Sequence, residues 1–151
     1  MMKKFKLVYI LVAASLLLAA TSVAAAGADS GRPFSTELTG AAEAPGPGDP
    51  DGSGSATLTL NPGLEEVCWE ISVADVAQIT AAHIHRAVAG VPGPVVVPLF
   101  PPLPDADGNS SGCIAADRDL ILDIIQNPEE YYVNVHNADF PAGALRGQLS
   151  K

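Results

Sequence analysis

The sequence predicts an all-β domain, an antiparallel sandwich or barrel that carries one short helix. Short segments alternate polar and apolar residues, as Ser-Ala-Thr-Leu-Thr-Leu does at 55–60, and this is typical of strands with one buried face. Turn signals rich in glycine and proline separate the segments, with 14 glycines and 13 prolines in the chain. A single segment has helical periodicity, so the pattern favours an antiparallel β fold over a helical or mixed one.

The first 26 residues have the pattern of an export signal. Lysines precede an apolar run at 7–20, and small residues follow it. The apolar run is short for a membrane span. We therefore expect a signal peptide that is cleaved after Ala26 or Ala28, and the alternative is an uncleaved N-terminal anchor.

Cleavage after Ala26 leaves residues 27–151, the size of one ordinary domain. Three of the 8 basic residues are lost with the signal, which leaves 5 against 17 acidic residues and a net charge of −12. Such a surface repels nucleic acid and anionic lipid. We expect a secreted, extracytoplasmic protein that binds neither nucleic acid nor, after cleavage, membrane.

The strands follow one another with turns between them. A long turn-rich loop at 44–54 separates the first two, and Pro98 interrupts the fifth. The expected strands lie at 34–38, 55–60, 66–73, 79–86, 95–100, 113–115, 131–136 and 145–149.

One helix is expected over residues 117–126. Asp117 is a suitable N-cap, and Asn127 with Pro128 ends the segment. The apolar residues between them recur at helical spacing and form one stripe, so this helix packs one face on the sheet.

The expected mature chain has two cysteines, Cys68 and Cys113. An even number of cysteines in an exported protein indicates a disulfide. Closing that loop would stabilise the fold by about 4 kcal/mol in the chain-entropy model. The alternative is a pair of buried free thiols.

All three histidines lie in two of the expected strands. His83 and His85 are two residues apart and share one strand face, as do Asn134 and His136. If the two strands are neighbours, three imidazoles converge and can bind copper or zinc. The alternative is that each ring hydrogen-bonds a carbonyl or carboxylate and holds a loop in place.

Arg146 lies in the last expected strand, between Leu145 and Gly147. An arginine beside such a site can guide anions toward it. More often such an arginine pairs with a carboxylate and fixes the terminal strand, and this structural interpretation is favoured.

Other site motifs are weaker. Fragments at 49–53 and 105–109 resemble the opening of a calcium loop, but the first lacks the closing glutamate, and both read better as solvated turns. The chain has no Gly-x-Ser-x-Gly motif and no glycine-rich phosphate loop. Hydrolases and nucleotide-binding proteins of these types are therefore disfavoured.

These segments resemble the CHRD domain, the module that is repeated in the growth-factor antagonist chordin and is found alone in many secreted bacterial proteins. The likeness includes Ala-Ala-His-Ile-His-Arg, Tyr-Val-Asn-Val-His and Leu-Arg-Gly-Gln-Leu and extends over essentially the whole mature chain. The matching segments lie at 34–43, 51–56, 81–86, 90–96, 132–136 and 140–149.

The resemblance implies an immunoglobulin-like barrel, a fold that has also been likened to copper, zinc superoxide dismutase. By that analogy His83, His85 and His136 fall where copper ligands lie, and Arg146 falls near the anion-guiding arginine. The chain has no fourth histidine to bridge two metals and no histidine-rich zinc loop. The analogy therefore leaves a three-histidine metal site and does not extend to redox catalysis.

We expect a secreted, non-enzymatic CHRD binding or structural module with a three-histidine site for copper or zinc. Its partner would be an extracellular protein or a matrix component. Two alternatives remain: a metalloenzyme that acts on superoxide or another small oxidant, and an adhesion domain of the matrix or cell surface.

Overall fold

The structure is a computed structural model and describes residues 31–99, 105 and 108–151. The expected signal peptide and Phe100, the end of the expected fifth strand, lie outside the described residues. The elements are β1 (Arg32–Thr39), η1 (Gly40–Ala42), β2 (Ser53–Asn61), β3 (Glu66–Ala74), β4 (Ile79–Arg86), β5 (Val95–Pro98), β6 (Ser110–Ala115), α1 (Arg118–Gln126), η2 (Pro128–Glu130), β7 (Tyr131–Asn137) and β8 (Leu145–Gln148).

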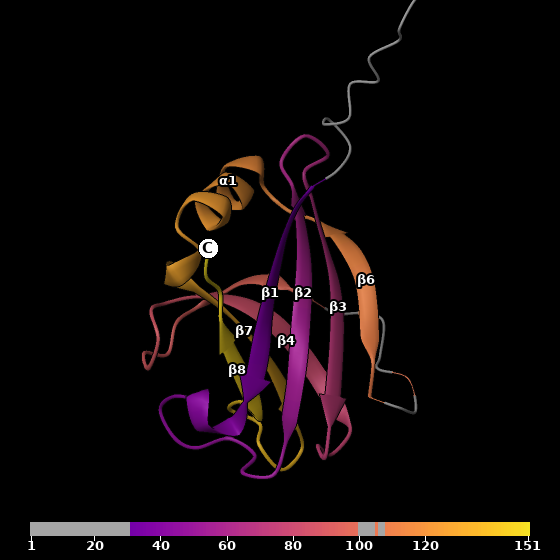
Figure 1. Ribbon diagram of the computed structural model, residues 1–151, viewed down its shortest axis with the longest axis vertical. Coiled ribbons are helices and arrows are strands. Elements are labelled where there is room, and N and C mark those ends of the chain that lie inside the picture. Colours follow the sequence, from indigo (N-terminus) through magenta and orange to yellow (C-terminus); the bar gives the residue numbers. More distant parts are fainter. Residues whose placement is uncertain (1–30, 100–104, 106–107) are drawn as a thin grey trace, which may run out of the picture.

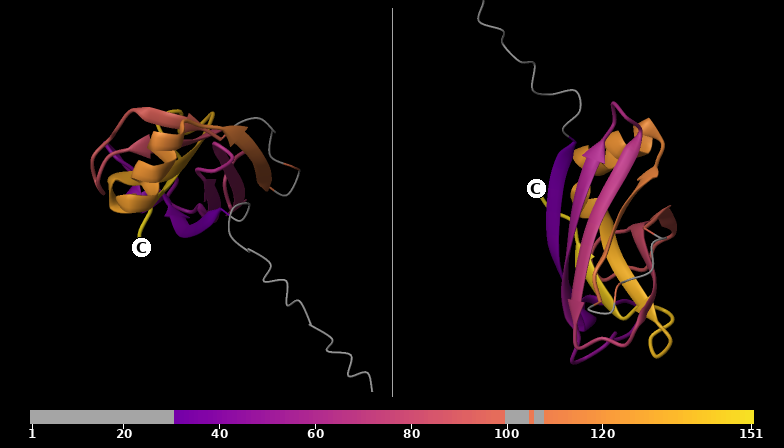
Figure 2. Two further views of the ribbon diagram at one scale, coloured as in Figure 1. Left: turned by 90° about the horizontal axis from the view of Figure 1, so that it is seen from above. Right: turned by 90° about the vertical axis from the view of Figure 1, so that its right-hand side faces the viewer.

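The described strands form one antiparallel sheet of eight strands in the order β5-β4-β7-β8-β1-β2-β3-β6. The sheet curls, so that β1, β2 and β3 lie in front of β4 and β7 (Figure 1), and the view from above shows the two halves facing each other (Figure 2). The halves join where β8 pairs with β1, through the register pair Thr39 and Arg146. The expected all-β fold with one short helix is confirmed.

The core lies between the two halves of the curled sheet and consists of the inward residues of each strand. In β2, Ala56, Leu58 and Leu60 are buried while the residues between them are more exposed. Strand β7 departs from this alternation, because six of its seven residues are buried. Its inward residues Val133 and Val135 belong to the core, so a second buried layer must cover its other face.

Helix α1 covers one end of the curled sheet (Figure 1). Asp117 caps it as expected, because its carboxylate accepts the backbone N–H groups of Asp119 and Leu120 at 2.9 and 3.1 Å. Ile121 and Ile124 are fully buried and dock the helix onto the core. The hydroxyl of Tyr131 donates to Asp123 at 2.6 Å and so links the helix to β7.

The two cysteines form the expected disulfide. Cys68 in β3 lies directly opposite Cys113 in β6, and their sulfurs are bonded at 2.03 Å. The bond ties β6, an end strand of the described sheet, to its only neighbour. The alternative of two free thiols is thereby excluded in this structure.

Candidate metal centre

The strand register brings the sequence-predicted residues together on the outward face of β4 and β7. Inward residues of these strands, such as Ile84 and Val133, lie in the core. On the other face, His83 lies opposite Asn134, and His85 lies opposite Tyr132. His136 lies opposite Ala81, two residues before His83, and it therefore joins the same cluster.

The three imidazoles converge. One ring nitrogen from each histidine lies within 4.8 Å of the corresponding nitrogen of the other two. The nearest pair is His83 Nδ1 and His136 Nε2, which are 3.1 Å apart. His85 lies further away, with ring centroids 5.6 Å from His83 and 6.4 Å from His136.

Backbone carbonyls contact two of the rings, and this contact sets the tautomer of His85. Nδ1 of His85 lies 2.8 Å from the oxygen of Gly93, and Nδ1 of His136 lies 3.1 Å from the oxygen of Pro141. A carbonyl only accepts, so Nδ1 of His85 carries the proton and donates, whereas His136 has acceptor oxygens at both nitrogens, with Oδ1 of Asn134 3.1 Å from its Nε2. Nε2 of His85 is then left with a lone pair, which is the form that ligates a metal.

This lone pair of His85 has no hydrogen-bond partner. Nε2 of His85 is buried and makes no hydrogen bond, although the other nitrogen of the same ring is well bonded. Leaving a buried acceptor unpaired costs about 1–3 kcal/mol. A metal ion held by the three rings would satisfy it, so the donor set and its unpaired nitrogen fit such an ion.

The surroundings favour the neutral form of two of the rings, His83 and His136. Burial, together with charge repulsion from the neighbouring His136 and His85, lowers the pKa of His83 to about 4. Burial also lowers the pKa of His136, although its bond to Pro141 opposes this. Neutral imidazole is the ligand form, so protons compete weakly with a metal at this place.

A carboxylate that sequence reasoning did not identify lies behind the histidine cluster. Glu43, which follows η1, accepts a hydrogen bond from the buried side chain of Asn134, and burial raises its pKa. Oδ1 of Asn134 in turn lies 3.1 Å from His136 Nε2. A Cβ at Gly143 would come within 2.5 Å of the Glu43 carboxylate, so a glycine is needed there. The only sequence signal for Glu43 was its place in the first segment of the family likeness.

Arg146 lies inside the protein, with 1% of its surface exposed. Its guanidinium donates to the carbonyls of Val91 and Val88 at 3.0 and 2.9 Å, and to Gln148 at 3.3 Å. Neither ion pair identified among residues 31–99, 105 and 108–151 involves it. This position favours the structural interpretation of Arg146, with backbone carbonyls in place of the expected carboxylate.

A second group of ligand-type residues has no free thiolate to offer. Glu66, Cys68 and Cys113 lie close together, but both sulfurs are in the disulfide. The fragment at 49–53 that resembles a calcium loop forms a turn, in which Asp49 accepts the N–H groups of Asp51 and Gly52, each at 3.2 Å. The fragment at 105–109 lies partly outside the described residues.

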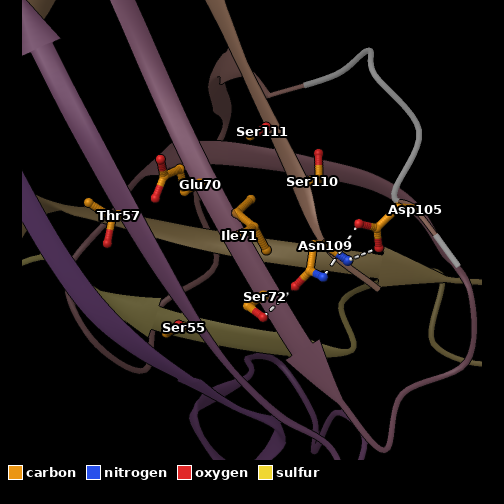
Figure 3. A pocket seen from close by; sticks show the side chains of 9 residues that line it. All are labelled: Ser55, Thr57, Glu70, Ile71, Ser72, Asp105, Asn109, Ser110 and Ser111. Atoms are coloured by element: carbon orange, nitrogen blue, oxygen red, sulfur yellow. Dashed lines mark hydrogen bonds between the residues drawn. The ribbon is translucent and has the colours of Figure 1, made fainter. Parts of the chain in front are cut away.

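The other half of the sheet has a shallow hollow of about 340 Å³ on its outward face (Figure 3). Hydroxyl, amide and carboxylate side chains surround it, and the hydroxyl of Ser72 is bonded to Asn109 at 2.6 Å. None of its described lining residues is a histidine, lysine or arginine. The lining residues are Ser55, Thr57, Glu70, Ile71, Ser72, Asp105, Asn109, Ser110 and Ser111.

Comparison with known protein families identifies one model that matches nearly all of the expected mature chain. The CHRD domain model matches residues 34–149, which include all three histidines, both cysteines and Arg146. No curated protein and no solved structure matches the chain. Within the residues that the structure describes, no helix is long and apolar enough to cross a membrane.

Proposed function

We propose that this chain, which belongs to the CHRD domain family, is a secreted, non-enzymatic binding module whose three histidines hold one copper or zinc ion. The observation that carries the proposal is the unpaired, buried Nε2 of His85 beside two further imidazoles. A hydrogen-bonded structural role would account for His83 and His136. It leaves the second nitrogen of His85 unexplained.

The distances support an ion of this size. Two nitrogens bound to one tetrahedral metal at 2.0–2.1 Å lie about 3.3–3.4 Å apart. The His83 and His136 nitrogens are already 3.1 Å apart, and the third lies within 4.8 Å of both. Small rotations of the side chains would therefore complete the ligand set. Three neutral imidazoles suit copper and zinc, and a further position would remain for water or another ligand.

A binding role is preferred to redox catalysis. A site that turns over superoxide benefits from a cation that draws the anion in. The nearby guanidinium of Arg146 is buried and occupied by backbone carbonyls. The acidic chain, with 17 acidic and 8 basic residues, would also repel a small anion.

The extracytoplasmic location and the partner rest on other features. A disulfide between Cys68 and Cys113 suits an oxidising compartment, and the pattern of the first 26 residues suits export. We infer an extracellular protein or matrix component as the partner. Its contact would be made through the β surface.

Calorimetric titration of the metal-free protein with zinc and with copper(II) tests the metal proposal. We expect one saturable site in the wild type and a loss of at least 100-fold in affinity in His85→Ala. Glu70→Gln is the matched control, because it removes one acidic side chain from the opposite half of the sheet and should leave the affinity unchanged. Absence of a saturable site at micromolar metal, or equal binding by His85→Ala, would overturn the proposal.

A further inference from the structure

The segment 87–94, between β4 and β5, lies against the histidine site and is tied down by its backbone. Arg146 binds the carbonyls of Val88 and Val91. Nε2 of Gln148 donates to the carbonyl of Ala87 at 2.9 Å. The N–H of Arg86 donates to the carbonyl of Pro94 at 3.1 Å. Side chains of β8 thus hold one end of the segment, and β4 holds the other.

Tyr132 connects Arg146 with His85. The guanidinium carbon of Arg146 lies 3.4 Å from the centre of the Tyr132 ring, a close cation–π contact. The ring of His85 stacks on Tyr132 with centroids 4.8 Å apart and planes inclined by 10°. The orientation of one metal ligand is therefore coupled through an aromatic ring to a buried charge on β8.

Gly93 forms hydrogen bonds with both Tyr132 and His85. Its N–H donates to the hydroxyl of Tyr132 at 3.2 Å, and its carbonyl accepts from Nδ1 of His85 at 2.8 Å. A Cβ at this position would lie 2.1 Å from the backbone oxygen of Arg86, so no side chain fits there. The N–H of Gly93 is thus held by the same tyrosine that stacks on the histidine.

We propose that Tyr132 and Arg146 are positioning residues, which hold segment 87–94 so that Gly93 keeps the proton of His85 on Nδ1 and its lone pair on Nε2. Neither residue touches the metal in this account. Their consequence for metal affinity rests on the proposed function, whereas their control of the His85 tautomer does not. Residues that orient metal-binding histidines in this way typically change metal affinity by 10–100-fold when they are altered.

The sharpest test is Tyr132→Phe, which keeps the ring and removes only the hydroxyl that accepts from Gly93. The matched control is Tyr131→Phe in the same strand, because that hydroxyl binds Asp123 and not the segment. Nitrogen-15 NMR of the metal-free proteins reports the tautomer of each histidine ring. We expect the His85 signals of the wild type and of Tyr131→Phe to show the proton on Nδ1, and those of Tyr132→Phe to shift toward a mixture.

Zinc titration of the same proteins supplies the second measurement. We expect about 10-fold weaker binding in Tyr132→Phe and unchanged binding in Tyr131→Phe. Arg146→Lys should shift the His85 tautomer in the same direction, because lysine lacks the planar fork whose two separate nitrogens bind the two carbonyls; if it does not fold, Tyr132→Phe alone decides. An unchanged His85 tautomer in Tyr132→Phe would overturn the inference. If the wild type bound no metal, the proposed function would fail while the tautomer measurement still decided this point.

Discussion

The two halves of the curled sheet follow the same inward and outward alternation but use their outward faces differently. Across β1, β2, β3 and β6, Ser35, Thr57, Glu70 and Ser111 lie side by side in register, and all but Thr57 are exposed. Across β7 and β8, the paired outward residues Asn134 and Arg146 are 2% and 1% exposed. One half presents hydroxyls to water, and the other has a second, polar interior.

Loops cause this difference in burial between the two outward faces. Segment 87–94 lies over Arg146 and Tyr132, and Glu43 with the turn at 140–143 lies over Asn134 and His136. Polar groups under such cover need partners, because burial without a hydrogen bond is costly. Backbone carbonyls supply most of them here. The comparison teaches that strand alternation alone does not separate a solvated face from a site; the covering segments decide it.

Removal of the disulfide is expected to have the largest effect on stability. Closing the loop between Cys68 and Cys113, which are 45 residues apart, stabilises the fold by about 4 kcal/mol in the chain-entropy model. Urea unfolding of the double variant Cys68→Ser, Cys113→Ser should show a loss near this size. Because the bond lies on the solvated half, the metal affinity of the folded variant should not change. A coupled loss of metal affinity would contradict the separation of the halves.

Arg146→Met should lower the free energy of unfolding by about 3 kcal/mol, since it leaves two carbonyls of segment 87–94 without donors. The control is Arg32→Met in β1. Arg32 is exposed and contacts the ring of Phe34 at 5.5 Å, so its loss should cost about 1 kcal/mol or less. Equal effects of the two changes, measured by urea unfolding, would contradict the view of a second interior.

The next largest effect should be a pH dependence of stability that arises from the histidine half of the sheet. His83 has a pKa lowered to about 4 in the folded metal-free protein, against about 6.5 when unfolded. Between these pH values the unfolded chain binds more protons than the folded protein. The contribution of His83 to stability is therefore fully present above pH 6.5 and is lost as the pH drops toward 4. After solvent screening we expect His83 to account for roughly 1–2 kcal/mol.

Urea unfolding at several pH values, with His83→Gln as the comparison, measures this contribution. The variant should lose part of the slope between pH 6.5 and 4. Parallel stability curves for the wild type and His83→Gln would show that His83 is not held neutral by its surroundings.

Thr57→Val should have the smallest effect. Thr57 lies on the solvated half, and its hydroxyl shares a hydrogen bond of 3.1 Å with Ser35 in an exposed position. We expect a change in unfolding free energy within about 0.5 kcal/mol and no change in metal affinity. A loss above 2 kcal/mol in thermal or urea unfolding would mean that this face is also a structured interior.

Much of the fold was predictable because it depends on local patterns. The alternation at 55–60 gave strand β2, and Asp117 with Asn127 and Pro128 gave the helix within one residue of its start. The pairing of His83 and His85 on one face followed from strand geometry alone. The neighbouring position of β7, which brings His136 to them, rests on long-range register that no local pattern encodes.

The surroundings of the site were less predictable. No local pattern indicated that Glu43 lies behind Asn134, because the segment after η1 carries it there. The partners of His85 and Arg146 are backbone carbonyls, and a carbonyl belongs to every residue. Loop conformation selects which ones are used, so residue types alone do not identify them.

The central claim is that one metal ion binds at the three histidines, and anomalous diffraction from crystals soaked with zinc tests it most directly. We predict a single strong peak about 2.0–2.1 Å from one ring nitrogen of each of His83, His85 and His136, with His85 ligating through Nε2. Absence of a peak at this place, or a peak only at the carboxylates of the solvated half, would contradict the account.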